Sequence, residues 1–275
     1  MKVSFAPLAL SVGGAGALLT VAWACASNPS ASMPGEIHSA AAILYEQHCA
    51  ACHGETGGGD GPMASFMRIS PRDFRRDKFR FISASSGEMA TDDDLERFIR
   101  SGSRASLMPA HPQLSREQLK ALAAYVKEFR RLGVITEIEE SFIDEGEDYT
   151  LEDLQEIADE RMIPALALVV PAHRPGYKTN RSRGAELYAA NCASCHGPTG
   201  HGDGTEELKD DSGRYIRARD LARGEYRGGG LDRDLFWRIR CGIPGTPMPA
   251  LGIGNATDED IWQLVDYVRF LPLAR

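Results

Sequence analysis

The chain has 275 residues and a formal net charge of −8. Twelve acidic residues and no Lys or Arg lie between Glu137 and Glu160, and without them the remainder carries a net charge of +4. The acidity is therefore local. A chain with this balance is not expected to bind nucleic acid, whose phosphates attract strongly basic proteins.

Residues 1–26 have the pattern of an export segment. Lys2 is the only charged residue among the first 35, and the apolar stretch from Val3 to Trp23 ends in small residues. Three fates are open: cleavage at an A-x-A pattern, lipidation of Cys25 in an imperfect lipobox, and retention as a membrane anchor. In each case we expect the mature protein in the periplasm or on the outer face of the cytoplasmic membrane.

The tract Cys49-Ala-Ala-Cys-His53 recurs as Cys192-Ala-Ser-Cys-His196. C-x-x-C-H is the spacing that attaches a c-type haem, because each thiol adds to one vinyl group and the next His ligates the iron. A zinc site or a thioredoxin-like pair fits poorly, since the two Cys pairs lie 143 residues apart and no βαβ pattern flanks them. We therefore predict two haem c groups, with thioether bonds and proximal ligands at Cys49, Cys52, His53, Cys192, Cys195 and His196.

The sequence around each motif is repeated as well. The run at residues 57–61 matches residues 200–204, and Arg72-Asp-Phe matches Arg219-Asp-Leu. Further matches continue to a Met-Pro pair in each half, and the offsets stay between 140 and 147. This period is too long for a solenoid, so each half is expected to be a domain that can fold alone.

The repeat also predicts the sixth iron ligand. Met248 is the only methionine after Cys192, and prolines on both sides stiffen its loop. The first half offers four methionines, of which the alignment with Met248 selects Met108. Met/His ligation is known for cytochromes c. His111 and His201 are the reserve candidates, although His201 lies in a Gly-rich turn and is expected to be solvated.

The last segment of each half is expected to be a helix. Ser115 with Gln118 and Thr257 with Asp260 have the spacing of a capping box, and an apolar face follows each. With the haem motifs and the Met loops, these segments resemble the class I cytochrome c family in its tandem dihaem form. The family's helix-crossing positions are matched by Ala41, Tyr45, Gly184, Tyr188, Tyr125 and Tyr267.

The resemblance implies an all-α fold of two class I cytochrome c domains, each a small helical shell around a covalently bound haem. Domain 1 is expected at residues 36–132 and domain 2 at 180–275, joined by an acidic, Pro-containing linker at 133–179. We expect the tyrosines to be packing residues rather than redox relays.

Arg72 and Arg219 occupy equivalent places, which suggests a shared role in binding haem propionates, since guanidinium pairs bidentately with carboxylates. Exposed charges are the equal alternative. The neighbouring residues from Arg68 to Arg80 make the first-half segment basic. Cys241, whose repeat counterpart is Ser101, is expected to be a buried, inert thiol.

The acidic insertion has two interpretations. Like-charge runs are usually solvated spacers, but this one could also dock on the basic segment of domain 1 or on a basic redox partner. Helical periodicity between Leu151 and Ile163 indicates that part of it is ordered.

Ligation indicates the function. An iron held by His and Met has no open position for substrate, so its chemistry is exchange between Fe(II) and Fe(III). We therefore expect an electron carrier or electron-transfer subunit, not an enzyme, that serves redox partner proteins of a respiratory chain. A dihaem peroxidase with one open haem and a haem sensor are the alternatives, but the paired Met loops disfavour the first and no output module supports the second.

Overall fold

The computed structural model describes residues 35–273 except 68, 85–87, 104–105, 174–175, 212 and 253. The predicted export segment, with Cys25, lies outside the described residues. Within them, no helix is long and apolar enough to cross a membrane.

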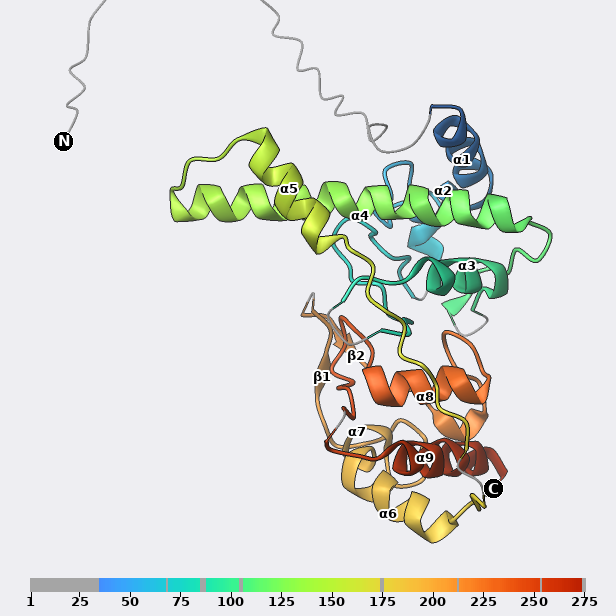
Figure 1. Cartoon of the computed structure of the whole chain (residues 1–275). Helices are drawn as coiled ribbons and strands as arrows, with labels where there is room; N and C mark the ends of the chain where they lie inside the picture. Colours follow the sequence, from blue (N-terminus) through green and yellow to red (C-terminus); the bar gives the residue numbers. More distant parts are fainter. Residues whose placement is uncertain are drawn as a thin grey trace, which may run out of the picture.

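Two helical domains lie one above the other (Figure 1). The first contains α1 (Gly35–His48), α2 (Ala50–His53), the 3-10 turn η2 (Ala64–Phe66), α3 (Asp92–Ser101) and the start of α4 (Arg116–Glu145). The second contains α6 (Arg181–Asn191), α7 (Ala193–His196), η4 (Leu221–Arg223), α8 (Asp232–Cys241), α9 (Asp258–Phe270) and η5 (Leu271–Leu273). Its only described strands, β1 (Leu208–Lys209) and β2 (Tyr215–Ile216), form an antiparallel pair with Leu208 opposite Ile216. The predicted all-α fold of two tandem domains is confirmed.

Capping fixes where the closing helices begin. The capping boxes predicted at Ser115 and Thr257 are present. Each of these side chains accepts a bond from the backbone N–H of Gln118 or Asp260, whose side chain in turn accepts a bond from the backbone N–H of the capping residue. Both predicted apolar faces are buried, that of α4 through Leu119, Leu122, Ala123, Val126 and Phe129, and that of α9 through Ile261, Leu264, Val265 and Val268.

Each domain is closed by a crossing of its first and last helices, α1 with α4 and α6 with α9. The crossings require small residues. Ala41 is fully buried, and a Cβ on Gly184 would lie 2.7 Å from the carbonyl oxygen of Gln263. Tyr45 and Tyr188 are buried beside these crossings and contact Tyr125 and Tyr267, as expected for packing residues.

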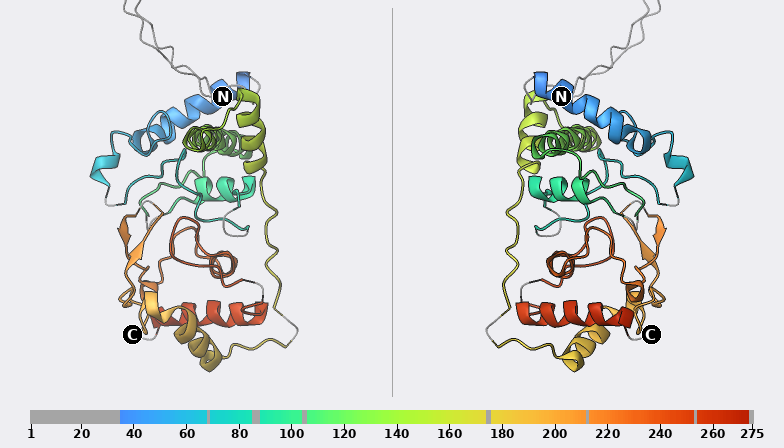
Figure 2. Two further views of the ribbon diagram at one scale, coloured as in Figure 1. Left: turned by 90° about the vertical axis from the view of Figure 1, so that its left-hand side faces the viewer. Right: turned by 90° about the vertical axis from the view of Figure 1, so that its right-hand side faces the viewer.

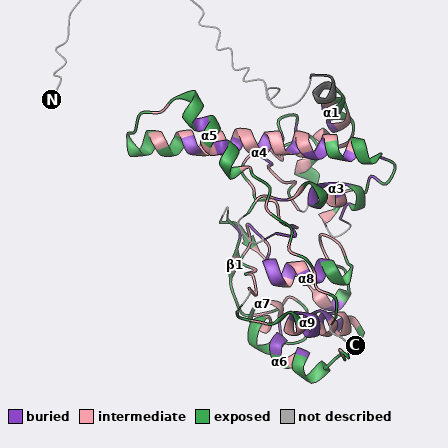
Figure 3. Cartoon of the chain, viewed as in Figure 1, coloured by how far each residue is buried: buried purple, intermediate pink, exposed green. Residues whose placement is uncertain are grey.

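The acidic insertion is largely helical. α4 continues through the predicted boundary at residue 132 and ends at Glu145, and the Gly146 that follows has a φ of 70°. The chain then turns back as α5 (Leu151–Arg161), and the hairpin buries Val134, Ile138, Leu154 and Ala158. These apolar residues are spaced along one face of each helix, so a small core forms although the surrounding positions are acidic and exposed (Figure 3).

Some carboxylates of the acidic insertion form ion pairs with arginines of domain 1. Arg130 binds both carboxylate oxygens of Glu137 at 2.8 and 2.9 Å, and Arg131 binds Asp159. Arg76, in the basic segment, lies 3.9 Å from Glu140. The insertion therefore docks on its own domain through a few ion pairs, whereas most of its carboxylates face solvent.

Residues 162–173 form an extended strap along one side of both domains (Figure 2). In domain 1, the backbone N–H of Leu168 donates to the carbonyl oxygen of Ser83 at 2.6 Å. In domain 2, Trp237 donates to the Leu168 carbonyl and Trp262 to that of Pro171. The strap is thus bonded to both domains.

The domains also contact each other directly, at positions that the repeat makes equivalent. The guanidinium of Arg97 stacks on Trp237 at 4.8 Å, and these residues are 140 apart. Phe81 and Gly228, which are 147 residues apart, are also in contact. A Cβ added to Gly228 would lie 2.3 Å from the aromatic ring of Phe81. Equivalent positions that meet each other mark a pseudo-two-fold axis, as in an isologous dimer.

Ion pairs extend this interface. Arg80 lies 3.5 Å from the buried carboxylate of Asp210, and Lys78 lies 3.4 Å from Asp211. The same arginine donates to the carbonyl oxygen of Gly245 at 3.5 Å. The basic segment of domain 1 is therefore bound to the β1–β2 hairpin and to the loop that carries Met248.

Candidate functional site

The two C-x-x-C-H tracts fold alike. Cys49 and Cys192 precede the one-turn helices α2 and α7, and each accepts a bond at its carbonyl oxygen from the N–H of the motif histidine, at 2.9 and 2.8 Å. Gly54 and Gly197 follow at the same φ of 77°. The carbonyl oxygens of these two glycines accept hydrogen bonds from the hydroxyls of Tyr45 and Tyr188, respectively. The tyrosine that closes the helix crossing thus also fixes the end of the haem motif.

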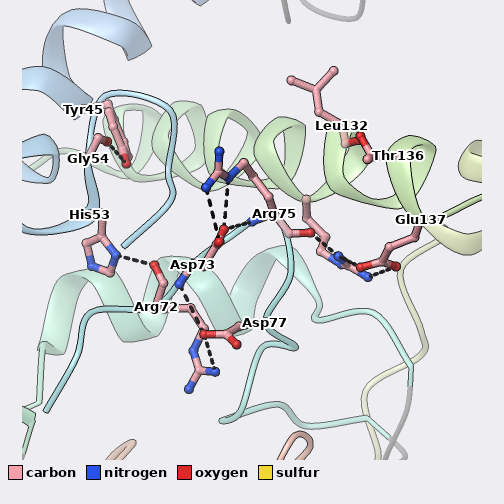
Figure 4. Close-up of polar contacts among 11 residues, drawn as sticks. Tyr45, His53, Gly54, Arg72, Asp73, Arg75, Asp77, Leu132, Thr136 and Glu137 are labelled. Atoms are coloured by element: carbon pink, nitrogen blue, oxygen red, sulfur yellow. Dashed lines mark hydrogen bonds and ion pairs between the residues drawn. The ribbon is translucent and has the colours of Figure 1, made fainter. Parts of the chain in front are cut away.

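Both motif histidines are oriented by a main-chain carbonyl. The Nδ1–H of His53 donates to the carbonyl oxygen of Arg72 at 3.0 Å (Figure 4), and that of His196 donates to the carbonyl oxygen of Arg219 at 3.0 Å. This bond fixes the tautomer and leaves Nε2 with a free lone pair, as a metal-ligating imidazole needs. Burial lowers the pKa of both imidazoles and favours the neutral form.

The aligned arginines use their side chains differently. Arg72 pairs with Asp77 at 3.0 Å, and burial together with the neighbouring Arg80 lowers its pKa to about 10. Arg219 pairs with Glu225 at 3.2 Å. Their shared structural role is therefore the carbonyl bond to histidine, and propionate binding stays a prediction.

The methionine loops follow α3 and α8. In the first loop, Ser103 and Met108 exchange two backbone hydrogen bonds of 2.8 and 3.1 Å. In the second, the N–H of Ile243 donates to the carbonyl oxygen of Met248 at 3.1 Å. Leu95 and Ile99 of α3 belong to the same core as Tyr45 and the Cys49 side chain, so α3 and the haem motif share one core. Leu235 of α8 shares a core with Tyr188 and Cys192.

Comparison with known proteins identifies the fold family. The family model described as "Cytochrome C oxidase, cbb3-type, subunit III" matches residues 38–126 and 179–268. The chain belongs to the class I c-type cytochromes, with two domains in tandem. A solved chain of the Kuenenia stuttgartiensis reducing HAO-like protein complex Kustc0457/Kustc0458 is similar, with a TM-score of 0.69 and 29% identity over 84% of this chain and 95% of that one. A search of curated proteins found no match.

The donor set of this cytochrome fits haem c. Each motif places two half-buried thiols and one tautomerically fixed imidazole on a single helical turn. Burial raises the pKa of Cys49 and Cys192 to about 11, which disfavours the thiolate that a zinc site uses. The residues that would hold the groups are Cys49, Cys52, His53, Met108, Cys192, Cys195, His196 and Met248.

The reserve candidates His111 and His201 make contacts with other protein side chains. His111 is buried in edge contact with His48, with 5.2 Å between ring centroids. His201 is about half exposed, and its Nδ1 lies 3.5 Å from Asp220, in agreement with a surface role. Cys241 is 1% exposed, and burial raises its pKa to about 11, as expected for an inert thiol.

Two residues of the site were missed from the sequence. Arg240 fastens the Met248 loop, and Arg80 joins that loop to domain 1. The repeat aligns Arg240 with Arg100, so residue type alone could not reveal that only one of the pair is buried. The cross-domain role of Arg80 depends on how the domains pack, for which the sequence contains no pattern.

Proposed function

We propose that the protein carries two covalently bound haem c groups and passes single electrons between redox partner proteins. A haem held by His and Met supplies exchange between Fe(II) and Fe(III). The chain's own contribution is to fix each imidazole through Arg72 or Arg219 and to present a methionine from each loop. The identical histidine geometry in both domains carries the proposal.

The packing of the domains favours one relay over two tethered carriers. Contacts at the pseudo-two-fold axis, the Arg80–Asp210 pair and the strap all restrict motion of one domain against the other. A fixed separation between redox groups supports transfer between them at a constant rate. Stopped-flow reduction should therefore show equilibration between the haems that is independent of protein concentration.

Haem quantification and ligand binding test this proposal. We expect two haems per chain in the pyridine haemochrome assay and no rapid carbon monoxide binding to the reduced protein. Rapid, stoichiometric binding at one haem would instead support a peroxidase-like enzyme or a sensor. A single haem per chain would rule out the relay.

We also infer that the protein works as a subunit of a larger oxidoreductase. The observation in favour is its similarity, along most of both chains, to a component of an HAO-like protein complex. Native mass spectrometry of the protein purified from its source should detect a stable hetero-oligomer that contains a second protein. Recovery as a monomer at every concentration would contradict this role.

Export completes the proposal. Haem attachment of this type is finished outside the cytoplasm, and residues 1–26 have an export pattern. We place the protein in the periplasm or on the outer membrane face, with attachment through lipidated Cys25 or the N-terminal segment. Mass spectrometry of the mature N-terminus distinguishes cleavage, lipidation and retention.

A further inference from the structure

The strap that joins the two domains exposes a row of large apolar side chains. Ile163, Leu166 and Val169 are 66%, 91% and 88% exposed. They are three residues apart, and so are Ala165 and Leu168, whose backbone N–H groups donate to domain 1 at 3.4 and 2.6 Å. One side of the strap is therefore fixed to the protein, and the apolar row at residues 163, 166 and 169 faces solvent.

The apolar row is held in one conformation. Besides its bonds to domain 1, the strap accepts hydrogen bonds at two of its carbonyl oxygens from Trp237 and Trp262 of domain 2. Residues 162–173 contain no Lys, Arg, Asp or Glu. Apolar side chains gathered on an exposed surface mark contact sites, and a fixed segment loses little conformational entropy when a partner binds. The row is thus a preorganised contact surface.

The acidic hairpin of α4 and α5 leads directly into this strap. Its far end projects beyond domain 1, and its outer surface is exposed (Figure 1, Figure 3). Eight of its carboxylates are exposed and form no ion pair with a described residue: Asp144, Glu145, Glu147, Asp148, Glu152, Asp153, Glu156 and Glu160. Glu156 and Glu160, on the last turns of α5, are the closest of them in sequence to Ile163. Negative charge therefore borders the apolar row.

Neither domain has an excess of positive charge that matches the hairpin. Residues 36–132 contain 14 Lys and Arg and 13 Asp and Glu, and residues 180–275 contain 13 and 14. In the basic segment, Arg72, Lys78 and Arg80 already pair with carboxylates of the same chain. A second copy of this chain would add another acidic hairpin, and an anionic lipid surface would repel the carboxylates. Charge complementarity therefore favours a different, basic protein.

We infer that the apolar row and the acidic hairpin together form the docking surface for a partner subunit that presents a lysine-rich face beside an apolar groove. The inference rests on the proposed role as a subunit of a larger oxidoreductase and adds the surface that binds the partner. The row forms the desolvated centre of the contact, and the carboxylates form its charged rim. The row therefore sets the dissociation rate, whereas the hairpin sets the association rate and its salt dependence.

Carbodiimide cross-linking of the hetero-oligomer purified from its source tests the docking surface, because the reagent joins a carboxylate directly to an amine that touches it. We expect Glu156 or Glu160 to be joined to lysines of the second protein. Links from that protein only to carboxylates of the two domains, or from the hairpin to a second copy of this chain, would overturn the inference and leave the subunit role intact. Purification without a second protein would contradict the subunit role and the inference with it.

A variant in the strap tests the apolar row, with the second protein of that hetero-oligomer immobilised and the holoprotein in solution. Leu166→Ala should weaken binding about tenfold, mainly through faster dissociation, because burial of a leucine side chain contributes at least this much. Leu273→Ala is the matched control, since Leu273 is 77% exposed on η5 of domain 2, and it should leave the affinity unchanged. Unaffected binding in Leu166→Ala would remove the row from the contact and overturn the inference.

A pair of charge variants tests the hairpin in the same assay. Glu156→Gln with Glu160→Gln should slow association about fivefold at low salt and make it less dependent on salt. Glu206→Gln with Glu207→Gln removes two exposed carboxylates of domain 2 and should leave the rate unchanged. All four side chains are exposed, so an unchanged haem absorption spectrum is expected in both variants. Equal slowing by the two pairs would assign steering to the net charge of the chain and overturn the role of the hairpin.

Discussion

The two domains share the geometry of their predicted histidine ligands but differ in the contacts around their predicted methionine ligands. His53 and His196 donate to carbonyl oxygens over the same distance, and the glycines that follow have the same φ. Around the methionines, by contrast, domain 2 has a clamp formed by the buried Arg240, whereas Arg100 of domain 1 is exposed and Leu107 has a φ of 60°. The repeat therefore preserved the geometry of the motif histidines, whereas the contacts around the two methionine loops differ between the domains.

Removing the haem-attachment cysteines of one domain should produce the largest difference between the two domains. Replacing Cys49 and Cys52 by Ala removes both thioether bonds in domain 1 and leaves domain 2 unchanged. We expect the covalent haem content to fall from two to one per chain, measured by intact mass. The reciprocal change at Cys192 and Cys195 is the control and should give the same mass loss. Two haems retained in either variant would contradict the assignment of the motifs.

Removal of the clamp should separate the domains by stability. Arg240→Gln leaves the half-buried carbonyl oxygens of Leu251 and Ala256 without their charged donor, which costs about 2–4 kcal/mol in the unfolding free energy of domain 2. Arg100→Gln, at an exposed equivalent position, should stay within about 0.5 kcal/mol. Denaturant unfolding followed at the haem absorption measures both. Equal effects would show that the clamp is not what distinguishes the loops.

How far the sequence predicts this molecule depends on the range of each interaction. Local signals succeeded: Ser115 and Thr257 begin their helices as expected, and the helix-crossing residues are buried. The insertion was harder, because the apolar face that includes Val134 and Ile138 is diluted by carboxylates and mimics a solvated spacer. The domain interface has no local pattern, since Arg97 and Trp237 meet only through tertiary packing.

A pH change should sharpen the comparison further. Burial, and secondarily the neighbouring His48, lowers the pKa of His111 in domain 1. The unfolded chain then binds more protons than the folded one, so the stability of domain 1 is full above the ordinary value of about 6.5 and declines as the pH falls below it. Leu251 occupies the equivalent position in domain 2 and does not titrate.

Hydrogen exchange between pH 7 and 5, corrected for its intrinsic pH dependence, can follow each domain separately. We expect protection in the core of α4 to fall more than protection in α9. His111→Leu copies the domain 2 residue and should abolish the difference. A difference that persists in this variant would assign the acid sensitivity to another group.

The smallest expected difference between the domains is the effect of Arg72 and Arg219 on the two haem potentials. Arg72 is a mostly buried cation beside the carbonyl that holds His53, whereas Arg219 pairs with an exposed carboxylate at the equivalent place. A buried positive charge disfavours Fe(III), so Arg72→Gln should lower the potential of the first haem, on the order of tens of millivolts, where 59 mV is a tenfold change for one electron. Arg219→Gln is the matched variant in domain 2 and should lower the second potential in the same direction, because the Arg219 side chain is 22% exposed, close to the 19% of Arg72. Spectroelectrochemical titration measures both potentials. An unchanged first potential in Arg72→Gln would remove the predicted propionate role and leave the main-chain carbonyl as the function of this position.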